Sequence, residues 1–403
     1  MRTSAPALVL LVLWMGLFPR PAAADVAFDL QALLPIDTWT ADLFAIDGHI
    51  AVYGDRTAHV VRVFQRTGTD WALVQTIPAP AGAVSFPGAV AIDGTTILAT
   101  ALAQGGGGYV YEHDGAAWTL RAQLTSSVLG GSFQTGQVVG LSGDTVVIAS
   151  ANLQNNLLHI YTRPAGGWIS MTESARVEAI RGSSRAEVVG DTIVWGGLDS
   201  DPITVNTNPV LRIYERTNGV WAGPTATLSA GPIGLVALLP RFDGTTVVGA
   251  VPFGSTTVFN FPTFVWTRPP GGWTDQLPDA LLTTTLPGAQ LLQADVSDDT
   301  IVVNYQVGDG LSAPSQHVAV YDRPEAGWSN MVETQILDAG VSWDHGVAVD
   351  GGTILSGTTS SCRAASGSRS ASPTSRTRST RETCSCTPSP SRTTARRRCR
   401  RSS

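Results

Sequence analysis

The sequence predicts an all-β protein, a seven-bladed β-propeller of four-stranded antiparallel blades that occupies residues 25–358. Three observations support this prediction: a tryptophan recurs about every 50 residues, a tight polar turn recurs seven times, and short apolar strands lie between them. Four-stranded units of this length pack radially around a central axis. A linear β-solenoid is the main alternative, but its period would be shorter and its strands parallel.

The tryptophans mark one kind of hairpin. Each follows an alternating strand and a Gly-containing turn, as in the stretches Ile160–Trp168 and Val265–Trp273. A residue that recurs at one structural place in every unit most often packs between neighbouring units, so we predict a structural role. The series is Trp71, Trp118, Trp168, Trp221, Trp273 and Trp328.

The polar turns mark a second hairpin, between the first two strands of each unit. Gly, Asp and Asn suit such turns because they tolerate positive φ. The seven copies centre on Asp47-Gly48, Asp93-Gly94, Gly143-Asp144, Gly190-Asp191, Asp243-Gly244, Asp298-Asp299 and Asp350-Gly351. Seven copies predict seven blades.

The tryptophan hairpins number six, so one outer strand must come from elsewhere. The segment Phe28–Leu34 resembles the outer strands Trp71–Ile77 and Trp118–Leu124. We therefore predict that Phe28–Leu34 completes the last blade, which would close the ring and cover its free sheet edges.

Residues 1–24 have the pattern of a signal peptide. Met1-Arg2 is followed by an apolar run from Ala7 to Phe18 and by small residues at Ala22–Ala24. The run is too short to cross a bilayer, which takes roughly 20 residues. The sequence thus predicts a secreted, periplasmic or cell-surface protein with no membrane span.

The charge distribution separates the body from the C-terminal segment. The chain has 403 residues, 14% of them charged, and no lysine; residues 25–358 hold 13 Arg against 31 acidic residues and no cysteine. Such an acidic body should avoid nucleic acid and anionic lipid, and it is long enough to bury a core without disulfides. We expect a monomer.

Residues 359–403 form an Arg/Ser-rich segment with 11 Arg, four Cys and one acidic residue, Glu382. This composition predicts a disordered basic tail. One interpretation is an Arg-rich arm for an anionic surface. Another is a shifted reading frame near residue 360, because the last blade lacks its third strand there and residues 381–390 can be encoded by codons whose shifted frame reads Gly-Asp-Val-Gln-Leu-Tyr-Thr-Phe-Thr.

The repeats resemble those of the bacterial FG-GAP family, whose fold is like the β-propeller of integrin α chains. The resemblance covers residues 25–358 and is carried by Gly143–Ile148, by Gly244–Ala250 and by the Tyr-x-Arg-Pro-x-Gly-Gly-Trp hairpins, whereas a literal Phe-Gly occurs only at Phe253-Gly254. It implies Ca²⁺ bound in Asp-x-Asp-x-Asp-Gly loops, but the sequence has no such loop. Asp199 and Asp201 offer two carboxylates where six to eight oxygens are needed, so we expect no cofactor and keep Ca²⁺ as an alternative.

No catalytic pattern emerges from the sequence. The six histidines show no metal-ligand spacing, and neither a phosphate-binding loop nor a Gly-x-Ser-x-Gly motif is present. The sequence therefore names no catalytic residue and leaves enzymatic activity undecided, with a non-enzyme favoured.

The connections between strands point to one face for binding. Those over Gly197–Pro209, Pro252–Pro262 and Tyr305–Gln316 are long and should emerge on the same face, whereas the hairpin turns are short. Loops on a rigid scaffold commonly carry binding residues. The candidate binding residues are Asp199, Asp201, Asn206, Asn208, Asn260, Tyr305 and Asp309.

These features together predict an exported binding or adhesion module whose partner is an extracellular protein or a glycan. A secreted enzyme acting on polysaccharide or peptide is an alternative, and it would need convergent carboxylates or histidines at the mouth of the channel. A structural component of the cell envelope is a third possibility.

Overall fold

The structure is a computed structural model, and it describes residues 28–34, 43–101, 107–128, 139–151, 156–178, 185–200, 207–231, 238–251, 262–308, 315–341, 346–358 and 361–367. The chain divides into two units, 1–368 and 369–403, and every described residue belongs to the first. The predicted signal peptide, residues 1–24, and the predicted tail beyond Gly367 lie outside the described residues.

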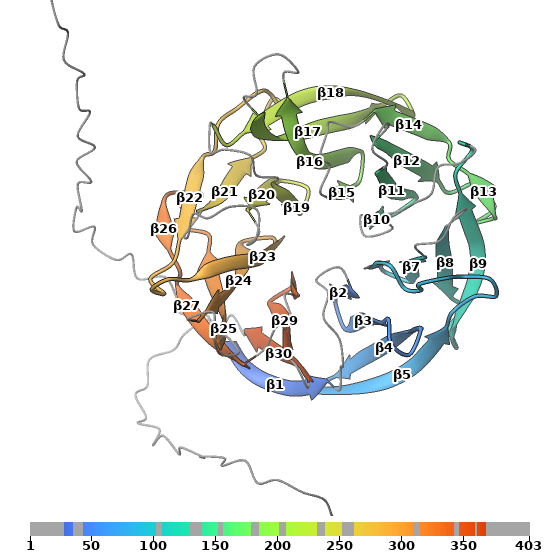
Figure 1. Cartoon of the computed structure of the whole chain (residues 1–403), viewed down its shortest axis with the longest axis horizontal. Coiled ribbons are helices and arrows are strands. Elements are labelled where there is room, and N and C mark those ends of the chain that lie inside the picture. The colour runs from blue at the N-terminus through green and yellow to red at the C-terminus, as the bar shows by residue number, and fades with distance from the viewer. Residues whose placement is uncertain are drawn as a thin grey trace, which may run out of the picture. The chain divides into compact units, whose positions relative to one another are not determined.

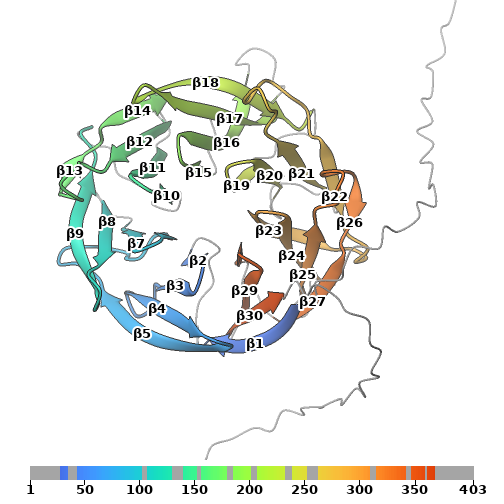
Figure 2. The same ribbon diagram turned by 180° about the vertical axis from the view of Figure 1, so that it is seen from behind.

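The described strands form seven sheets arranged around a common centre (Figures 1 and 2). Sheet I contains β2 (Phe44–Asp47), β3 (Ile50–Asp55), β4 (Val60–Thr67) and β5 (Asp70–Pro78). Sheet II contains β6 (Val90–Asp93), β7 (Thr96–Thr100), β8 (Gly108–His113) and β9 (Trp118–Thr125), with β13 (Met171–Thr172) added at its edge. Sheet III contains β10 (Val139–Ser142), β11 (Thr145–Ala151), β12 (Asn156–Thr162) and β14 (Ala175–Glu178).

The remaining sheets repeat this order. Sheet IV contains β15 (Ala186–Val189), β16 (Thr192–Ser200), β17 (Thr207–Thr217) and β18 (Val220–Ser229). Sheet V contains β19 (Leu239–Phe242), β20 (Thr246–Ala250), β21 (Thr263–Thr267) and β22 (Ala280–Thr283), with β26 (Met331–Val332) at its edge. Sheet VI contains β23 (Gln290–Ser297), β24 (Thr300–Val307), β25 (Ser315–Asp322) and β27 (Gln335–Val341). Sheet VII contains β28 (Val347–Asp350), β29 (Thr353–Thr358), β30 (Ser361–Gly367) and β1 (Phe28–Leu34).

Sheets I to VI each take their four main strands from one continuous stretch of chain, whereas sheet VII combines both ends. β1 pairs with β30, from Phe28 opposite Gly367 to Leu34 opposite Cys362, so Phe28–Leu34 is the outer strand of the last sheet, as the sequence predicts. β30 itself lies in the segment predicted to be a disordered tail, so this sheet extends past residue 358 to Gly367. β30 forms backbone hydrogen bonds with β29 on one side and β1 on the other. Backbone pairing does not depend on side-chain type, so an Arg/Ser-rich segment can still form this strand.

Every predicted polar turn is the hairpin between the first and second strands of a sheet. The turns place a residue in the left-handed region, such as Gly48 at φ 56°. The hairpin of sheet VI places Asp298 there at φ 53°, where the other six have glycine. This agrees with the tolerance of Gly and Asp for positive φ.

The tryptophan hairpins differ from the prediction in three sheets. In sheets III, V and VI the outer strand does not open with tryptophan but begins later, at Ala175, Ala280 and Gln335. The residues between pair with the preceding sheet: β13 lies parallel to β9, β26 parallel to β22, and Gln276 bridges to Leu228. These are the hairpins that contain Arg-Pro, and proline, which has no N–H, ends the third strand there.

The apolar core lies between neighbouring sheets. Trp118 of sheet II, for example, packs with Val52 and Val63 of sheet I. Trp168, Trp221, Trp273 and Trp328 likewise lie in clusters shared with the preceding sheet, and Trp71 packs against Leu355 of sheet VII. Burial of an indole removes a large apolar area from water, so the tryptophans hold adjacent sheets together.

The innermost strands contact one another in a cycle. Each of β2, β6, β10, β15, β19, β23 and β28 contacts the innermost strand of the next sheet, and β28 contacts β2. Two polar contacts cross between sheets VII and I: Gly48 N donates to Asp350, and Arg66 Nη1 donates to Thr353 Oγ1 at 2.6 Å. The two ends of the repeat are therefore joined by side chains as well as by β1.

Candidate functional site

Tyr305, one of the predicted binding residues, is a core residue. It lies in β24 with 2% of its surface exposed, in the cluster between sheets V and VI. Its hydroxyl is 3.4 Å from that of Tyr321, and burial raises the pKa of Tyr305 to about 12. The predicted loop is a strand at this point, and the strand alternation turns Ile301, Val303 and Tyr305 into the core. The prediction for Tyr305 was therefore wrong.

Two other predicted residues lie in strands where a loop was expected. Asp199 in β16 pairs with Asn208 in β17, because the long hairpin extends to Ser200 and Thr207. The structure describes the backbone of Asp199 and Asn208 but not their side chains. Asp201, Asn206, Asn260 and Asp309 lie outside the described residues, so their assignment to a binding face stays a prediction.

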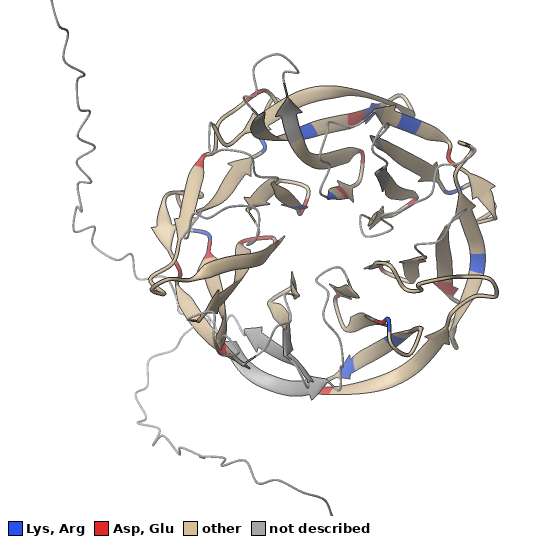
Figure 3. Ribbon diagram, in the orientation of Figure 1, with Lys and Arg blue, Asp and Glu red and all other residues tan. Residues whose placement is uncertain are grey.

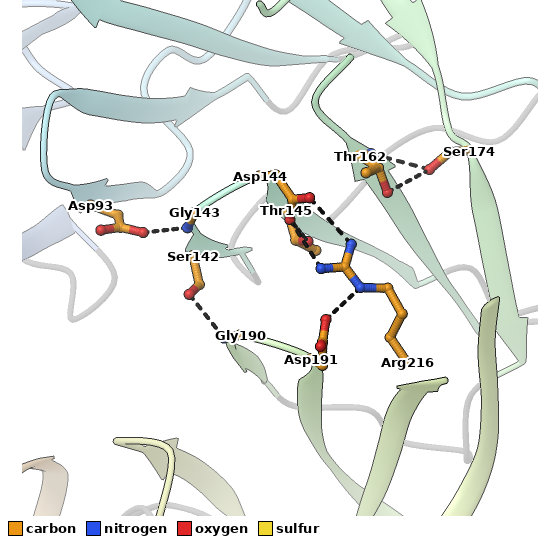
Figure 4. A network of polar contacts seen from close by, with 10 residues as sticks. All are labelled: Asp93, Ser142, Gly143, Asp144, Thr145, Thr162, Ser174, Gly190, Asp191 and Arg216. Carbon is orange, nitrogen blue, oxygen red and sulfur yellow. Dashed lines mark hydrogen bonds and ion pairs between the residues drawn. The ribbon is translucent and has the colours of Figure 1, made fainter. Parts of the chain in front are cut away.

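Polar turns at one end of the inner strands link several neighbouring sheets, among them sheets II, III and IV (Figure 4). Gly143 N donates to Asp93 of the preceding sheet, and Gly190 N donates to Ser142 at 3.0 Å. Arg216 reinforces the same junction: its Nε lies 2.6 Å from Asp191 Oδ1 and its Nη2 lies 3.2 Å from Asp144 Oδ1. These contacts join sheets and leave the turn residues with a structural role.

A second position on the inner strands differs between sheets. We define the inner-strand position as the residue three places before the positive-φ residue of the hairpin turn. It holds Ala or Gly in sheets VII, I, II and III and a charged residue in sheets IV, V and VI. The small residues are Ala348, Ala45, Ala91 and Gly140, and the charged ones are Glu187, Arg241 and Asp295.

The charged residues meet in one network with Arg185, and we call these four residues the inner charge cluster. Arg241 lies at its centre: its Nη1 is 2.7 Å from Glu187 Oε1 of the preceding sheet, and its Nε is 3.5 Å from Asp295 Oδ1 of the next. Arg185 Nε approaches the other side of the network, 2.6 Å from Glu187 Oε1. Figure 3 shows basic and acidic segments together on the inner strands of this part of the ring. Two guanidinium groups thus face two carboxylates across three sheets.

The cluster is largely shielded from solvent. The side chain of Arg241 is 11% exposed, and those of Asp295 and Glu187 are 18% and 19% exposed. Burial raises the pKa of Asp295 to about 7, although its Oδ2 accepts a hydrogen bond from Val349 N at 2.8 Å. The charge of Asp295 would therefore change near neutral pH.

Asp295 also belongs to a ladder of side chains that covers the free edge of β28. Gln293, Asp295 and Ser297 accept hydrogen bonds from the backbone N–H groups of Val347, Val349 and Gly351 in the next sheet. Such contacts satisfy donors that a free strand edge would leave unpaired. The carboxylate of Asp295 thus accepts a hydrogen bond from the Val349 backbone and also pairs with the Arg241 guanidinium.

One constellation resembles a catalytic triad in composition but not in arrangement. Glu173 lies 3.5 Å from His159 Nδ1 and accepts a hydrogen bond from Ser127 Oγ at 2.6 Å, so the serine and the histidine both face the carboxylate. A nucleophilic triad instead needs the histidine between the other two groups. Glu333 contacts Thr285 in the same way in the corresponding place between sheets V and VI, where Ala319 replaces the histidine. The shared carboxylate–hydroxyl contact is thus a structural feature of the repeat.

Within the described ranges, no group of three or more His, Cys, Asp or Glu side chains is placed to hold a metal ion. In the same part of the chain, no helix has the length and hydropathy to cross a membrane.

No protein-family model matches the chain, and no curated protein matches it in sequence. Solved structures match its fold. A chain of the mitotic checkpoint complex is 10% identical with a TM-score of 0.52, and the match covers 88% of this chain and 98% of that one. The structure of U3-55K is 8% identical with a TM-score of 0.53, covering 84% and 98%, and the RRP9 WD40 repeats are 9% identical with a TM-score of 0.50, covering 86% and 98%.

The fold is a β-propeller. At these identities the likeness concerns the fold alone, and the resemblance to FG-GAP repeats stays a prediction.

The inner charge cluster is the feature that the sequence analysis missed, although the sequence contains its signal. Aligning the seven inner strands on their turns places Glu187, Arg241 and Asp295 in one column with alanines and a glycine. The sequence analysis chose its candidate binding residues by loop length, and loop length does not compare the same strand position in different sheets.

Proposed function

We propose that the protein is an exported β-propeller that binds an extracellular protein or a glycan, with the inner charge cluster at the centre of its recognition surface. The observation that carries the proposal is the charge at the inner-strand position in sheets IV to VI. Four other sheets build the same strand with Ala or Gly, so the fold does not require charge there. Replacing buried ion pairs by packed apolar residues is often neutral or stabilising, so stability alone does not account for the cluster.

The chemistry of the cluster suits a polar partner. Arg185 and Arg241 provide planar donors, and Glu187 and Asp295 provide acceptors, on the inner strands of a rigid scaffold. Propeller folds commonly present such groups at the ends of the central channel. A glycan or a polar peptide loop can exchange hydrogen bonds with both kinds of group.

The experiment is a binding screen of the mature protein against arrays of glycans and of extracellular proteins. The proposal predicts reproducible binding to members of at least one class, weakened by salt because charged groups take part. If the protein, shown to be folded by its near-UV circular dichroism, binds nothing on either array, the proposed function is wrong.

We further propose that sheet VII acts as the seventh blade of a closed ring of FG-GAP-like repeats. The pairing of β1 with β30 and the contacts from Gly48 to Asp350 and from Arg66 to Thr353 support this. Deleting residues 25–34 should lower the melting temperature markedly, because sheet VII then loses its outer strand. An unchanged melting temperature would show that the ring does not depend on β1.

Export is proposed from the N-terminal pattern of residues 1–24. Expression of the full chain in a bacterial host should yield a mature protein outside the cytoplasm whose N-terminal residue, read by mass spectrometry, is Asp25. Recovery of uncleaved protein from the cytoplasm alone would contradict export.

We also propose that the segment from about residue 360 onward reflects a shifted reading frame. Its Arg/Ser-rich composition departs from that of the repeats, although residues 361–367 still form β30 and supply the third strand of sheet VII. Resequencing of the nucleotides for residues 355–403 tests this directly. A frame that stands unchanged makes the basic segment a genuine part of the protein and overturns the proposal.

A second candidate function is hydrolysis of a polysaccharide. Glu187 and Asp295 contact the same guanidinium group, and burial raises the pKa of Asp295 to about 7, so the carboxyl of Asp295 can hold a proton near neutral pH. Glycosidases use such pairs as acid and base. Release of reducing ends from a panel of polysaccharides that disappears in Asp295→Asn would support this function, and absence of release from every substrate would exclude it for that panel.

A further inference from the structure

Two sheet junctions share a contact in which a carboxylate and a tyrosine hold the end of the preceding outer strand. Between sheets II and III, Glu173 accepts hydrogen bonds from Ser127 N at 2.8 Å and from Ser127 Oγ at 2.6 Å, just beyond the end of β9. The hydroxyl of Tyr161 donates to the Thr125 carbonyl at 3.0 Å and fixes the same strand end. We call these four residues the first clasp.

The junction between sheets V and VI repeats these contacts. Glu333 accepts hydrogen bonds from Thr285 N at 3.1 Å and from Thr285 Oγ1, and the hydroxyl of Tyr321 donates to the Thr283 carbonyl at 2.9 Å. We call these four residues the second clasp. Because the carboxylate, the tyrosine and the strand end correspond, the second clasp is a reference for the first within the same molecule.

The two clasps differ in the side chains beside the carboxylate. His159 Nδ1 lies 3.5 Å from Glu173 Oε1, and Arg176 Nε lies 3.5 Å from the same oxygen. His159 and Arg176 are opposite each other in the strand register, and the equivalent pair in sheet VI is Ala319 and Ile336. The first clasp therefore has a histidine that can gain a proton where the second has an alanine.

His159 is enclosed at the interface of sheets II and III. It is 1% exposed, and the side chain of Glu173 is 2% exposed. Among the described residues, the charged groups that act on its imidazole are Glu173 and Arg176, and Tyr161 lies on the same face of β12. Sheet II contributes apolar side chains to this interface, among them Val110, Ala122 and Leu124.

A positive charge on this imidazole is poorly stabilised while the clasp is closed. Burial lowers the pKa of His159, Glu173 opposes that effect, and Arg176 adds to it. The carboxylate of Glu173 already accepts two hydrogen bonds from Ser127 and pairs with Arg176, so a full ion pair with His159 would draw it away from these contacts. Contact with water stabilises the protonated imidazole better, and it requires the clasp to open.

We propose that the first clasp is a pH-dependent contact, closed at neutral pH and opened in mildly acidic solution, where the end of β9 separates from sheet III. Once the clasp is open, His159 takes up a proton below its ordinary pKa of 6.5, and in the closed clasp it does so only at lower pH, so acid favours the open form. The second clasp, with Ala319, stays closed over this range. The contact uses none of the four residues of the inner charge cluster and does not rest on the proposed function.

The experiment measures hydrogen exchange of the full chain by mass spectrometry at pH 7.5 and pH 5.5, on peptides that contain Ser127 or Thr285. Rates are corrected for the intrinsic dependence of exchange on pH. At pH 5.5 a histidine with the ordinary pKa is about nine-tenths protonated, so protection at Ser127 should fall by up to about tenfold. Protection at Thr285 should stay the same.

Variants assign the effect to His159. His159→Ala copies the second clasp and should keep protection at Ser127 equal at the two pH values. His159→Gln, which cannot gain a proton, replaces it if the alanine variant does not fold. His49→Ala removes an exposed histidine of sheet I and should retain the fall. Equal protection of Ser127 at both pH values in the wild type, an equal fall at Thr285, or a fall that persists without His159 would overturn the proposal.

Discussion

The inner strands of this propeller fall into two groups that share a backbone and differ in chemistry. Sheets VII, I, II and III have Ala or Gly at the inner-strand position, whereas sheets IV, V and VI have Glu187, Arg241 and Asp295. All seven strands end in the same hairpin turn and contact their neighbours in one cycle. The ring is therefore built without charge in four sheets, and the charge in the other three is an addition to the scaffold.

At Gly140 the small residue is itself a requirement of packing. A Cβ on Gly140 would lie 2.8 Å from Val147 Cγ2 and 3.0 Å from the backbone N of Val188 in the next sheet. On the charged side, Arg241 instead reaches to both neighbouring sheets and donates from Nε to the Ala294 carbonyl at 3.0 Å. Sheets III and IV thus meet by direct backbone approach at Gly140, whereas sheets IV, V and VI are joined through side chains.

The largest effect should come from removing the centre of the charged side. Arg241→Met leaves Glu187 and Asp295 buried without their shared partner, and breaking a buried ion pair costs about 3–5 kcal/mol. The free energy of unfolding in urea should fall by about 3 kcal/mol. Arg268→Ala is the matched control, because Arg268 pairs with Glu215 at 3.1 Å while 40% exposed and should cost less than about 1 kcal/mol. Equal losses in the two variants would contradict a distinct charged side.

The second prediction concerns Gly140, where the inner strand of sheet III should not tolerate a larger side chain. Gly140→Ala forces a methyl group against the backbone of sheet IV, and such overpacking costs about 1–3 kcal/mol. Gly166→Ala, at a turn where a Cβ would meet nothing within 4 Å, should leave stability unchanged or slightly higher. Urea unfolding of both variants measures the difference, and tolerance of Gly140→Ala would show that close backbone approach does not set the residue.

Asp295 should also give the protein a pH-dependent stability. The pKa of Asp295 is about 7 in the folded protein, above its ordinary value of 3.8, so the folded state holds a proton that the unfolded state releases. This contribution favours folding at low pH and is lost as the pH rises from about 4 to 7. Asp295→Asn should therefore gain about 2–3 kcal/mol relative to the wild type between pH 5 and pH 8. A constant difference between the two proteins across this range would place the pKa of Asp295 outside it.

The smallest effect concerns the turns, in which sheet VI again differs from the rest. Asp298 adopts φ 53° where the other six turns have glycine. Asp298→Gly should raise the free energy of unfolding by about 0.5 kcal/mol, because glycine adopts this conformation without steric cost. Gly48→Asp in sheet I should lower it by a similar amount. Opposite signs would mean that the carboxylate of Asp298 makes a stabilising contact that outweighs the backbone preference.

The repeat could be predicted from the sequence because each sheet uses the same turn residues and buried aromatic residues. Polar turns such as Asp47-Gly48 and buried tryptophans such as Trp118 mark positions where backbone conformation or packing between sheets restricts the residue type. Those signals predict the hairpins and the outer strand Phe28–Leu34. These signals do not indicate where a strand ends. Tyr305 was therefore predicted to lie in a loop, whereas β24 continues to Val307.

The candidate site is harder to read, because its residues are far apart in the chain. Glu187, Arg241 and Asp295 come from three strands about 50 residues apart, and no local spacing joins them. The ring brings them together. The difference becomes visible only when the seven inner strands are aligned, because three of them then have a charged residue where the other four have Ala or Gly.

The most direct test of the central claim is the affinity of the double variant Glu187→Gln, Asp295→Asn for the strongest ligand from the binding screen. Both substitutions keep side-chain shape and remove only charge. Glu215→Gln, which removes an acidic group of an outer pair, is the control. We predict that the double variant binds about tenfold more weakly or worse, corresponding to about 1.4 kcal/mol, while the control binds like the wild type. A folded double variant with wild-type affinity would show that the inner charge cluster does not recognise the partner.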